Sequence, residues 1–362
     1  MSAAAFAISY LPWLAGGPVL AALADRYSYR KVMIFCDLSR MALVALVALP
    51  AIPVWAMFVL VFATALLGPP FDAARSALTP QVLSGDRYVL GLGVQNSALQ
   101  TSQILGYLAG STLAQFNTHL ALGINALSFG VSAALIAACV KKRPGVGDAR
   151  RRHILRETGE GIQVVFGRPE LRSIALMAFL TVTFVAIPEG LSAGWAAALL
   201  LDGSAQGLIM AAAPVGMALG GILMPRLLAP ATRRRMLRPL VALAPLALVP
   251  ALFEPPLAVV IGMIAVAGFA CGSFLPIANG LFVQAVPGTH RARAFGVLAA
   301  GTQLTQGAAL LATGAVTGIF GVSTGIGVWA VGGLVLLCVV FTRTASISEE
   351  PAAQDPDAKL AE

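Results

Sequence analysis

Long runs of apolar residues, separated by short polar loops, follow one another along the whole chain. A helix that crosses a bilayer needs about 20 mainly apolar residues, whereas a strand of a membrane barrel needs about 10 residues of alternating polarity. The runs in this chain are far longer than barrel strands and show no alternation. The pattern therefore predicts an all-α membrane protein, a helical bundle with 11 transmembrane helices at about residues 3–24, 32–50, 53–71, 90–115, 119–140, 171–190, 204–228, 238–253, 256–283, 292–319 and 321–342.

Composition agrees with lipid as the solvent for most of the chain. Of its 362 residues, 58% are hydrophobic and 11% are charged, whereas a soluble domain has about 25% charged residues. The net charge of +8 is spread over short loops and forms no continuous basic face, so we expect no nucleic-acid partner. The 4 cysteines form no CxxC pair and the 3 histidines are scattered, so we expect no metal, no disulfide and no cofactor.

The 24 lysine and arginine residues all lie in alternate loops or in the halves of the spans that adjoin those loops. The intervening loops, near residues 51, 117, 202, 254 and 320, contain none. Because basic residues collect on the cytoplasmic side of a membrane, this pattern predicts a multi-pass protein of the cell membrane (the inner or plasma membrane) with a cytoplasmic C-terminus. Eleven spans would leave the N-terminus outside, which is unusual without a signal. We therefore expect that a first transmembrane helix is absent from this sequence, through a misplaced start codon or a real truncation.

A repeat with an offset of six spans indicates two related groups of helices. Gln100-Thr-Ser-Gln103 in the fourth span corresponds to Gln303-Leu-Thr-Gln306 in the tenth. Parallel repeats of this kind are one known transporter plan, with the substrate site between the halves. We expect pseudo-symmetric halves of 5 + 6 helices at residues 1–140 and 171–343. A basic cytoplasmic linker with an interfacial helix would join them at residues 141–170, and a disordered cytoplasmic tail would follow at residues 344–362.

The sequence ALADRYSYRK, which ends at Lys31, resembles the cytoplasmic signature of the major facilitator superfamily. That signature reads Gly-x-x-x-Asp-Arg-x-Gly-x-basic-basic. The positions that match it are Asp25, Arg26, Arg30 and Lys31, and those that replace its glycines are Ala21 and Ser28. The stretch DAARSALTP from Asp72 and the region around Glu189 are similar to the efflux branch that includes enterobactin and macrolide exporters. The resemblance implies a major-facilitator-type bundle and a secondary active transporter.

The resemblance also implies a conformational gate at the cytoplasmic helix ends, made by Asp25, Arg26, Arg30, Lys31, Asp72 and Arg75. Asp25 would face the N-terminus of the tenth span near residues 291–294, where the helix dipole favours an anion. It could also pair with Arg75, while Asp72 pairs with Arg26 or Arg30. Such contacts would hold the halves together when the cavity opens outward. The alternative is a cluster of surface ion pairs, which contribute little stability.

Glu189 stands out as an acidic residue within an apolar span, away from the cytoplasmic face. It lies between Pro188 and Gly190, which predicts an interrupted helix at this point. Ionisable residues within spans are costly and usually face a cavity, so Glu189 is a candidate proton site. The alternative places it at the outer interface, where it is solvated and caps the next segment, because it lies about 27 Å along a helix that begins at Leu171.

Amide side chains form polar stripes on two spans. The candidate cavity lining is Asn96, Gln100, Gln103, Asn279, Gln303 and Gln306. Amides facing lipid are disfavoured, so these residues should face water, a solute or another helix, and hydrogen bonds between helices are the alternative to a solute site. Three GxxxG pairs, which begin at Gly106, Gly216 and Gly314, predict close helix packing.

No nucleotide-binding glycine loop, catalytic triad or zinc-protease motif occurs, which argues against an ATP-driven pump and against an enzyme. We expect a secondary active transporter that exports a hydrophobic or amphipathic small molecule by alternating access, with protons as the coupling ion. An uptake symporter for a small metabolite is one alternative, and a non-transporting membrane receptor or truncated remnant is another. The expected partners are the small-molecule substrate, protons and the lipid bilayer, and we expect a monomer.

Overall fold

The computed structural model describes residues 27–50, 52–83, 86–141, 154–228, 232, 235–286 and 291–348, and these residues form helices and no strand. The helices before the long linker are α4 (Tyr29–Val47), α5 (Val54–Leu66), α6 (Gly68–Val82), α7 (Asp86–Phe116) and α8 (Thr118–Cys139). The linker contributes α9 (Ile154–Gly167). After it come α10 (Pro169–Ala198), α11 (Gly203–Leu227), α13 (Leu237–Leu248) with the 3-10 turn η1 (Val249–Phe253), α14 (Leu257–Ala285), α15 (Arg291–Phe320) and α16 (Val322–Ser348).

Six helical segments in the described part of the chain are long and apolar enough to cross a bilayer: Val54–Thr79, Thr118–Cys139, Pro169–Ala198, Gly203–Met224, Leu257–Ala285 and Arg293–Phe320. Two shorter apolar helices are Leu237–Phe253 and Val322–Cys338. The predicted all-α fold is confirmed. The count of 11 stays a prediction, because the first predicted span, residues 3–24, lies outside the described residues.

Three predicted boundaries differ from the structure. The third span continues from α5 through α6, because the prolines Pro69 and Pro70 stand at the start of α6, where a helix tolerates them. The sixth span does not end near residue 190, since α10 continues to Ala198. The last helix reaches Ser348, which moves the start of the predicted tail, and residues 349–362 lie outside the described part.

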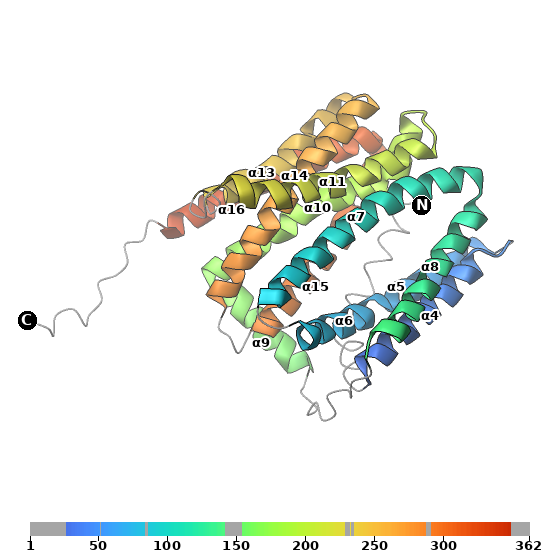
Figure 1. Ribbon diagram of the computed structural model, residues 1–362. Helices are drawn as coiled ribbons and strands as arrows, with labels where there is room; N and C mark the ends of the chain where they lie inside the picture. The colour runs from blue at the N-terminus through green and yellow to red at the C-terminus, as the bar shows by residue number, and fades with distance from the viewer. Residues whose placement is uncertain are drawn as a thin grey trace, which may run out of the picture.

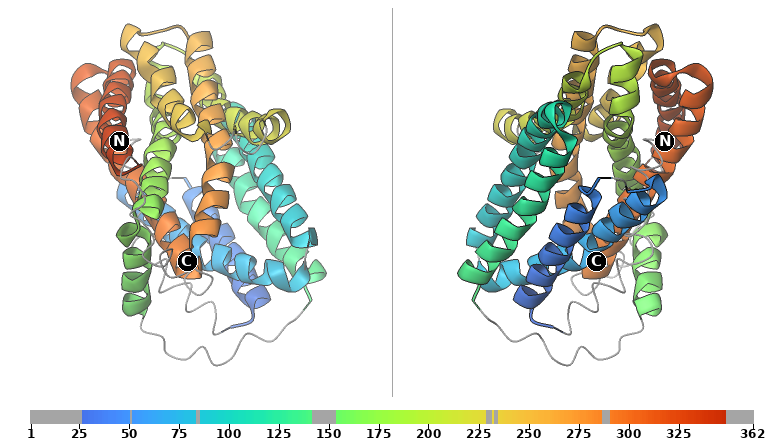
Figure 2. Two further views of the ribbon diagram at one scale, coloured as in Figure 1. Left: turned by 90° about the vertical axis from the view of Figure 1, so that its left-hand side faces the viewer. Right: turned by 90° about the vertical axis from the view of Figure 1, so that its right-hand side faces the viewer.

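The helices form two groups that lie side by side (Figure 1). In one group α4 packs against α8, α6 and α5, and in the other α10 packs against α11, α14, α15 and α16. The main contact between the groups in the described chain is between α7 and α11. Both views in Figure 2 show several long helices that run along the length of the molecule, and shorter helices that lie across it.

The loops without basic residues gather at one end of the bundle. His119 Nδ1 lies 2.7 Å from Ala48 O, and Ser323 Oγ donates to Ala251 O at 2.8 Å, so the hairpin loops of neighbouring helix pairs touch. We call this the Asn117 end. The opposite end, which we call the Arg168 end, carries the described cations of the second group, Arg168, Arg172, Arg226, Arg235, Arg238 and Arg293. This separation agrees with the charge pattern of the sequence.

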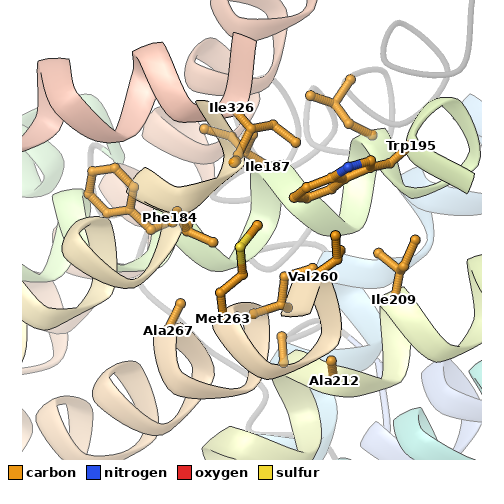
Figure 3. Packing of buried hydrophobic residues seen from close by; sticks show 14 of the residues in the cluster. Phe184, Ile187, Trp195, Ile209, Ala212, Val260, Met263, Ala267 and Ile326 are labelled. Carbon is orange, nitrogen blue, oxygen red and sulfur yellow. The ribbon is translucent and has the colours of Figure 1, made fainter. Parts of the chain in front are cut away.

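Two apolar clusters hold the second group together. The cluster nearer the Asn117 end includes Phe184, Ile187, Trp195, Ile209 and Met263, drawn in Figure 3. The cluster nearer the Arg168 end includes the buried side chains of Val165, Leu171, Phe274, Phe282 and Leu337. These clusters fix α10 at the centre of its group, and α10 carries Glu189.

Glycines bring α11 and α14 into backbone contact, as predicted for the pair that begins at Gly216. A Cβ atom on Gly216 would lie 1.9 Å from Ala265 O, and one on Gly220 would lie 2.3 Å from Phe269 O. The prediction is wrong for Gly106 and Gly110, where a Cβ atom would meet nothing within 4 Å. The spacing alone therefore does not identify a packed glycine pair.

The linker helix α9 docks on the second group. Val165 is buried, and a Cβ atom on Gly161 would lie 3.0 Å from the main-chain oxygen of Arg293. Glu160 Oε2 accepts from Arg293 Nη1 at 2.5 Å. Ile162 and Phe166 stay exposed on the same helix. One face of α9 thus contacts α15, while its apolar residues on another face are open, and contact with a membrane surface remains a prediction.

Candidate functional site

Glu189 lies within a continuous helix and not at the edge of the bundle. Pro188 is accommodated inside α10, and nine residues follow Glu189 before α10 ends at Ala198. At the rise of an α-helix this distance is about 14 Å. The predicted helix interruption is wrong, and so is the alternative of a solvated carboxyl group that caps the next segment. Proline can stay in a membrane helix because neighbouring groups satisfy the freed backbone carbonyl.

A tyrosine of the other helix group contacts the Glu189 carboxyl group. Tyr107 Oη on α7 donates a hydrogen bond to Glu189 Oε1. Tyr107 lies nine residues before the end of α7 at Phe116, so the two residues have the same depth, about 14 Å from the Asn117 end. Both side chains are partly buried. Sequence reasoning did not single out Tyr107, because one tyrosine in an apolar run carries no spacing signal.

The turns of α7 on either side of Tyr107 contact α11, and we call this contact the α7–α11 seam. A Cβ atom on Gly207 would lie 1.8 Å from Ser111 Oγ and 2.9 Å from Tyr107 O. With its amide oxygen turned toward α11, Gln115 accepts from the main-chain N–H groups of Gly203, at 3.1 Å, and Ser204. Gln115 thereby caps the first turn of α11, whose N–H groups have no partner within the helix.

Asp202 precedes α11 at the same end of the seam. Its carboxylate accepts from Ser204 Oγ at 2.5 Å. The side-chain hydrogen bond from Ser204, with smaller contributions from main-chain N–H groups, lowers the pKa of this exposed carboxyl group below its ordinary value. Asp202 therefore stays charged at neutral and mildly acidic pH.

The residues of the predicted amide stripe of α7 differ in their burial and contacts. Gln100 is 7% exposed, and its Nε2 lies 4.0 Å from Met217 Sδ of α11, so it belongs to the seam. Its Oε1 is buried without a hydrogen-bond partner among the described residues. Gln103 is half-buried, and Asn96 is exposed on the part of α7 nearer the Arg168 end.

In the described part of the chain, no hydrogen bond joins the amide side chains of the second group to those of α7. Gln303 and Gln306 on α15 are half-buried, and Asn279 on α14 is exposed. Leu310, one turn after Gln306, packs against Gly190 of α10, where a Cβ atom would lie 2.6 Å from Leu310 Cδ1. The turn of α15 that follows Gln306 therefore contacts α10 at the residue next to Glu189 in the chain. Its role as a cavity lining stays a prediction.

The similarity of this chain to a known protein family identifies the class of membrane protein to which it belongs. The model of the Major Facilitator Superfamily matches residues 1–200 and 174–361, which together cover nearly the whole chain. This chain belongs to the major facilitator superfamily. It is a membrane transporter and not an enzyme, and its helices cross the membrane several times.

One curated member of the superfamily is similar over a limited region. This major facilitator is 27% identical over 127 residues to the uncharacterized MFS-type transporter YfiS of Bacillus subtilis (strain 168). The match spans 35% of this chain and 30% of YfiS, so it covers less than a third of that relative. It supports the family and adds no substrate.

Solved major facilitators share the fold at low sequence identity. A point mutant of the nucleoside transporter NupG superposes with a TM-score of 0.73 at 17% identity, covering 95% of this chain and 90% of NupG. A POT family transporter in complex with 5-aminolevulinic acid gives 0.75 at 10% identity, covering 96% and 87%. A bacterial homologue of the human lysosomal transporter Spinster gives 0.72 at 14% identity, covering 96% and 90%.

Four of the six predicted gate residues of this major facilitator lie in the described part of the chain. Asp25 and Arg26 lie outside the described residues. Asp72 Oδ1 pairs with Arg75 Nη2 of its own helix at 2.9 Å. Arg30 donates to the main-chain oxygen of Ala137 on α8, and Lys31 is exposed. In this structure Arg30 therefore ties α4 to α8, and the predicted gate contacts of Asp25 stay a prediction.

The structure adds a buried charge pair in the middle of α4 that sequence reasoning missed. Asp37 is 1% exposed, accepts from Ser132 Oγ of α8 at 2.6 Å, and lies 3.7 Å from Arg40 Nη1. The Arg40 guanidinium lies over the rings of Phe71, at 5.1 Å, and Phe129, at 5.7 Å. The signal was present as an acid and a base one turn apart on one face of a span.

Metal binding finds no support in the part of the chain that the structure covers. There, no group of three or more His, Cys, Asp or Glu side chains could hold an ion. Among the described residues, the polar side chains that connect the two helix groups include Glu189, Tyr107, Gln100 and Gln115.

Proposed function

We propose that this major facilitator is a secondary active exporter that carries hydrophobic or amphipathic small molecules out of the cell in exchange for protons. It works in the cell membrane as a monomer, with the Arg168 end and the C-terminus in the cytoplasm. The observation that carries the proposal is the place of Glu189. This carboxyl group lies inside a membrane-length helix and contacts the other helix group through Tyr107.

An acid in this place can exchange a proton between two sides of the membrane. Alternating access rocks one group of helices against the other around a central site, and the Tyr107–Glu189 contact crosses that division. The surrounding amides are uncharged, and Gln100 Oε1 offers an acceptor to a donor group. This environment favours neutral or cationic lipophilic solutes over phosphates.

The α7–α11 seam indicates which state of the alternating-access cycle this conformation represents. Contacts run along α7 from Gln115 to Gln100, which is about 22 Å of helix. Beyond Gln100, toward the Arg168 end, Val94 and Asn96 are exposed. With the Asn117 end outside, as the charge pattern predicts, the molecule is closed to the outside. The gate of Asp25 and Arg75 would then form in the opposite state.

Transport by Glu189→Gln tests the proposal, because glutamine keeps the shape of the side chain but cannot carry a proton. Inverted membrane vesicles that contain the protein are energised, and accumulation of the lipophilic cation ethidium is followed with and without a pH gradient. We expect the wild type to accumulate ethidium when the lumen is acidic. Glu189→Gln should lose this response to the gradient.

A matched control is Glu254→Gln, since Glu254 is an exposed acid in the loop after η1. This variant should behave as the wild type. Retention of gradient-driven accumulation by Glu189→Gln would contradict the proton role. Accumulation only in right-side-out vesicles would replace the exporter with the uptake symporter, and no gradient-linked movement in either orientation would favour the non-transporting alternative.

A further inference from the structure

We infer that Tyr107 is a positioning residue that links the ionisation of Glu189 to closure of the α7–α11 seam. The inference rests on the proposed proton role of Glu189. It adds a residue from the other helix group and states how the carboxyl group acts on the moving contact.

Tyr107 is attached to two helices of the second group at once. Its hydroxyl group donates to Glu189 Oε1 on α10. Its main-chain oxygen lies in the close contact with α11, 2.9 Å from the place of a Cβ atom on Gly207. One turn further along α7, Ser111 fills the rest of the space beside Gly207. A change at the hydroxyl group is therefore passed directly to the backbone that forms the seam.

The strength of the hydroxyl contact depends on the proton of Glu189. An ionised carboxylate only accepts hydrogen bonds, and charge-assisted bonds are about twice as strong as neutral ones. The ionised form therefore holds Tyr107 and α7 against the second group, and the protonated form holds them less. After the empty carrier has released its proton inside, the ionised carboxylate keeps the carrier closed to the outside. The carrier therefore does not return to the outward-open state without a solute, and no proton is spent in vain. Protonation, or a solute that displaces the tyrosine, releases the seam.

Other titratable groups in the described part of the chain do not provide this link. On the helices packed on α10, the charged side chains that the structure describes lie toward the Arg168 end, at Glu160, Arg226, Arg238 and Arg293. Asp202 lies at the Asn117 end of the seam, but its lowered pKa keeps it charged at mildly acidic pH. The remaining described groups near mid-helix are the thiols of Cys271 on α14 and Cys338 on α16. Replacing the native cysteines by alanine removes both thiols from the test.

The experiment measures the opening of the seam directly. Spin labels are placed at Phe116→Cys and Phe253→Cys, which are 84% and 81% exposed at the Asn117 end of the two helix groups. The background is the full chain with its four native cysteines replaced, in lipid nanodiscs, and double electron–electron resonance gives the distance distribution. For the wild type we expect a dominant short distance in mildly alkaline buffer and a longer one in mildly acidic buffer.

Tyr107→Phe should remove the pH dependence of this distribution. A hydrogen bond to a charged group contributes enough for the closed population in alkaline buffer to fall about tenfold relative to the open one. Glu189→Asp gives a second route to the same result, because it keeps a titratable acid but shortens its reach toward Tyr107. Thr112→Ala is the matched control, since Thr112 is exposed on α7 and its Oγ1 donates within its own helix to Leu108 O at 2.8 Å. It should keep the response of the wild type.

The outcomes separate the inference from the proposed function. If Glu189→Gln abolishes the pH response but Tyr107→Phe and Glu189→Asp both retain it, Glu189 acts without Tyr107 and the inference is wrong. If Glu189→Gln itself retains the pH response, the proposed proton role of Glu189 is wrong, and the inference that rests on it is wrong as well. Loss of the response in all three variants, with the Thr112→Ala distribution unchanged, supports the link.

Discussion

The two helix groups are held together in different ways. The second group, α10–α16, has two large apolar clusters, and its α11 and α14 meet through glycines. The first group, α4–α8, has one small described cluster around Tyr29, Met33, Ala74 and Leu78, and α5 has no buried residue. At the centre of the first group lies a charge pair, Asp37 and Arg40, packed between aromatic rings.

This difference shows two solutions to one problem. Lipid tails are as apolar as leucine, so apolar burial alone gives helices little reason to associate in a bilayer. Close backbone contact at small residues is one source of attraction, and polar ties between helices are another. The second group relies on the first source and the first group on the second. The comparison can therefore be tested by breaking each kind of contact separately.

The largest effect is expected from Asp37→Ala. It leaves the Arg40 guanidinium, 14% exposed, without its carboxylate, and removes the acceptor of Ser132. Removing one partner of a buried pair typically costs about 3–5 kcal/mol of stability. Thermal unfolding of the purified protein should show this as a lower midpoint with loss of folded yield.

Two companion variants sharpen this prediction. Asp37→Asn keeps an acceptor for Ser132 and should cost less than alanine. The double variant Asp37→Leu with Arg40→Met removes both charges and should recover part of the loss, because an apolar pair of similar volume can replace a buried ion pair. If alanine at position 37 unfolds at the wild-type temperature, the charge pair does not hold the first group together.

The next effect concerns the glycine contact of the second group. Gly216→Ala places a Cβ atom 1.9 Å from Ala265 O, so α11 and α14 must move apart. Overpacking of a tight contact typically costs about 1–3 kcal/mol. Gly262→Ala on α14 is the matched control, because a Cβ atom there would meet nothing within 4 Å. The midpoint of thermal unfolding should fall for Gly216→Ala and not for Gly262→Ala. Equal midpoints would show that α11 and α14 can move apart at little cost in stability.

The sequence predicts the helices better than it predicts the polar contacts between them. Apolar runs place α8, α11 and α14 to within about three residues, because lipid requires long helices there. The apolar run at residues 32–50 predicts α4 as a span, but the charge pattern groups Arg40 with the cations of the neighbouring loop, so its pairing with Asp37 is not apparent from the sequence. Glu189 was found as an acid in a span. Its depth was misjudged because the predicted span ended at residue 190, whereas α10 continues through Pro188 to Ala198.

Tyr107 shows why a site of this kind needs tertiary structure. Its partner is 82 positions away in the chain, and no local pattern links the two. Gln100 illustrates the opposite case: its stripe was visible in the sequence, but whether it faces a solute or another helix depends on the seam with Met217. Periodicity identifies the face of a helix, and the packing of the other group decides what that face meets.

The smallest effect is expected at the linker helix, and it decides whether α9 belongs to the second group. Glu160 and Arg293 are 37% and 28% exposed, so their ion pair should contribute at most about 1 kcal/mol to stability. Glu160→Gln should therefore leave the unfolding midpoint nearly unchanged. It should instead raise the hydrogen exchange of the amides of residues 160–167, because the helix loses a tie to α15 while Val165 and Gly161 keep their contacts.

The matched control for the linker helix is Gln163→Ala, an exposed position on the same helix. Its exchange should equal that of the wild type, and high salt should reproduce the effect of Glu160→Gln in the unmodified protein by screening the pair. Fast exchange of α9 in the wild type would place it outside the second group. Slow exchange that survives both Glu160→Gln and salt would assign the docking of α9 to Val165 and Gly161, so that close apolar packing, as elsewhere in the second group, holds the linker.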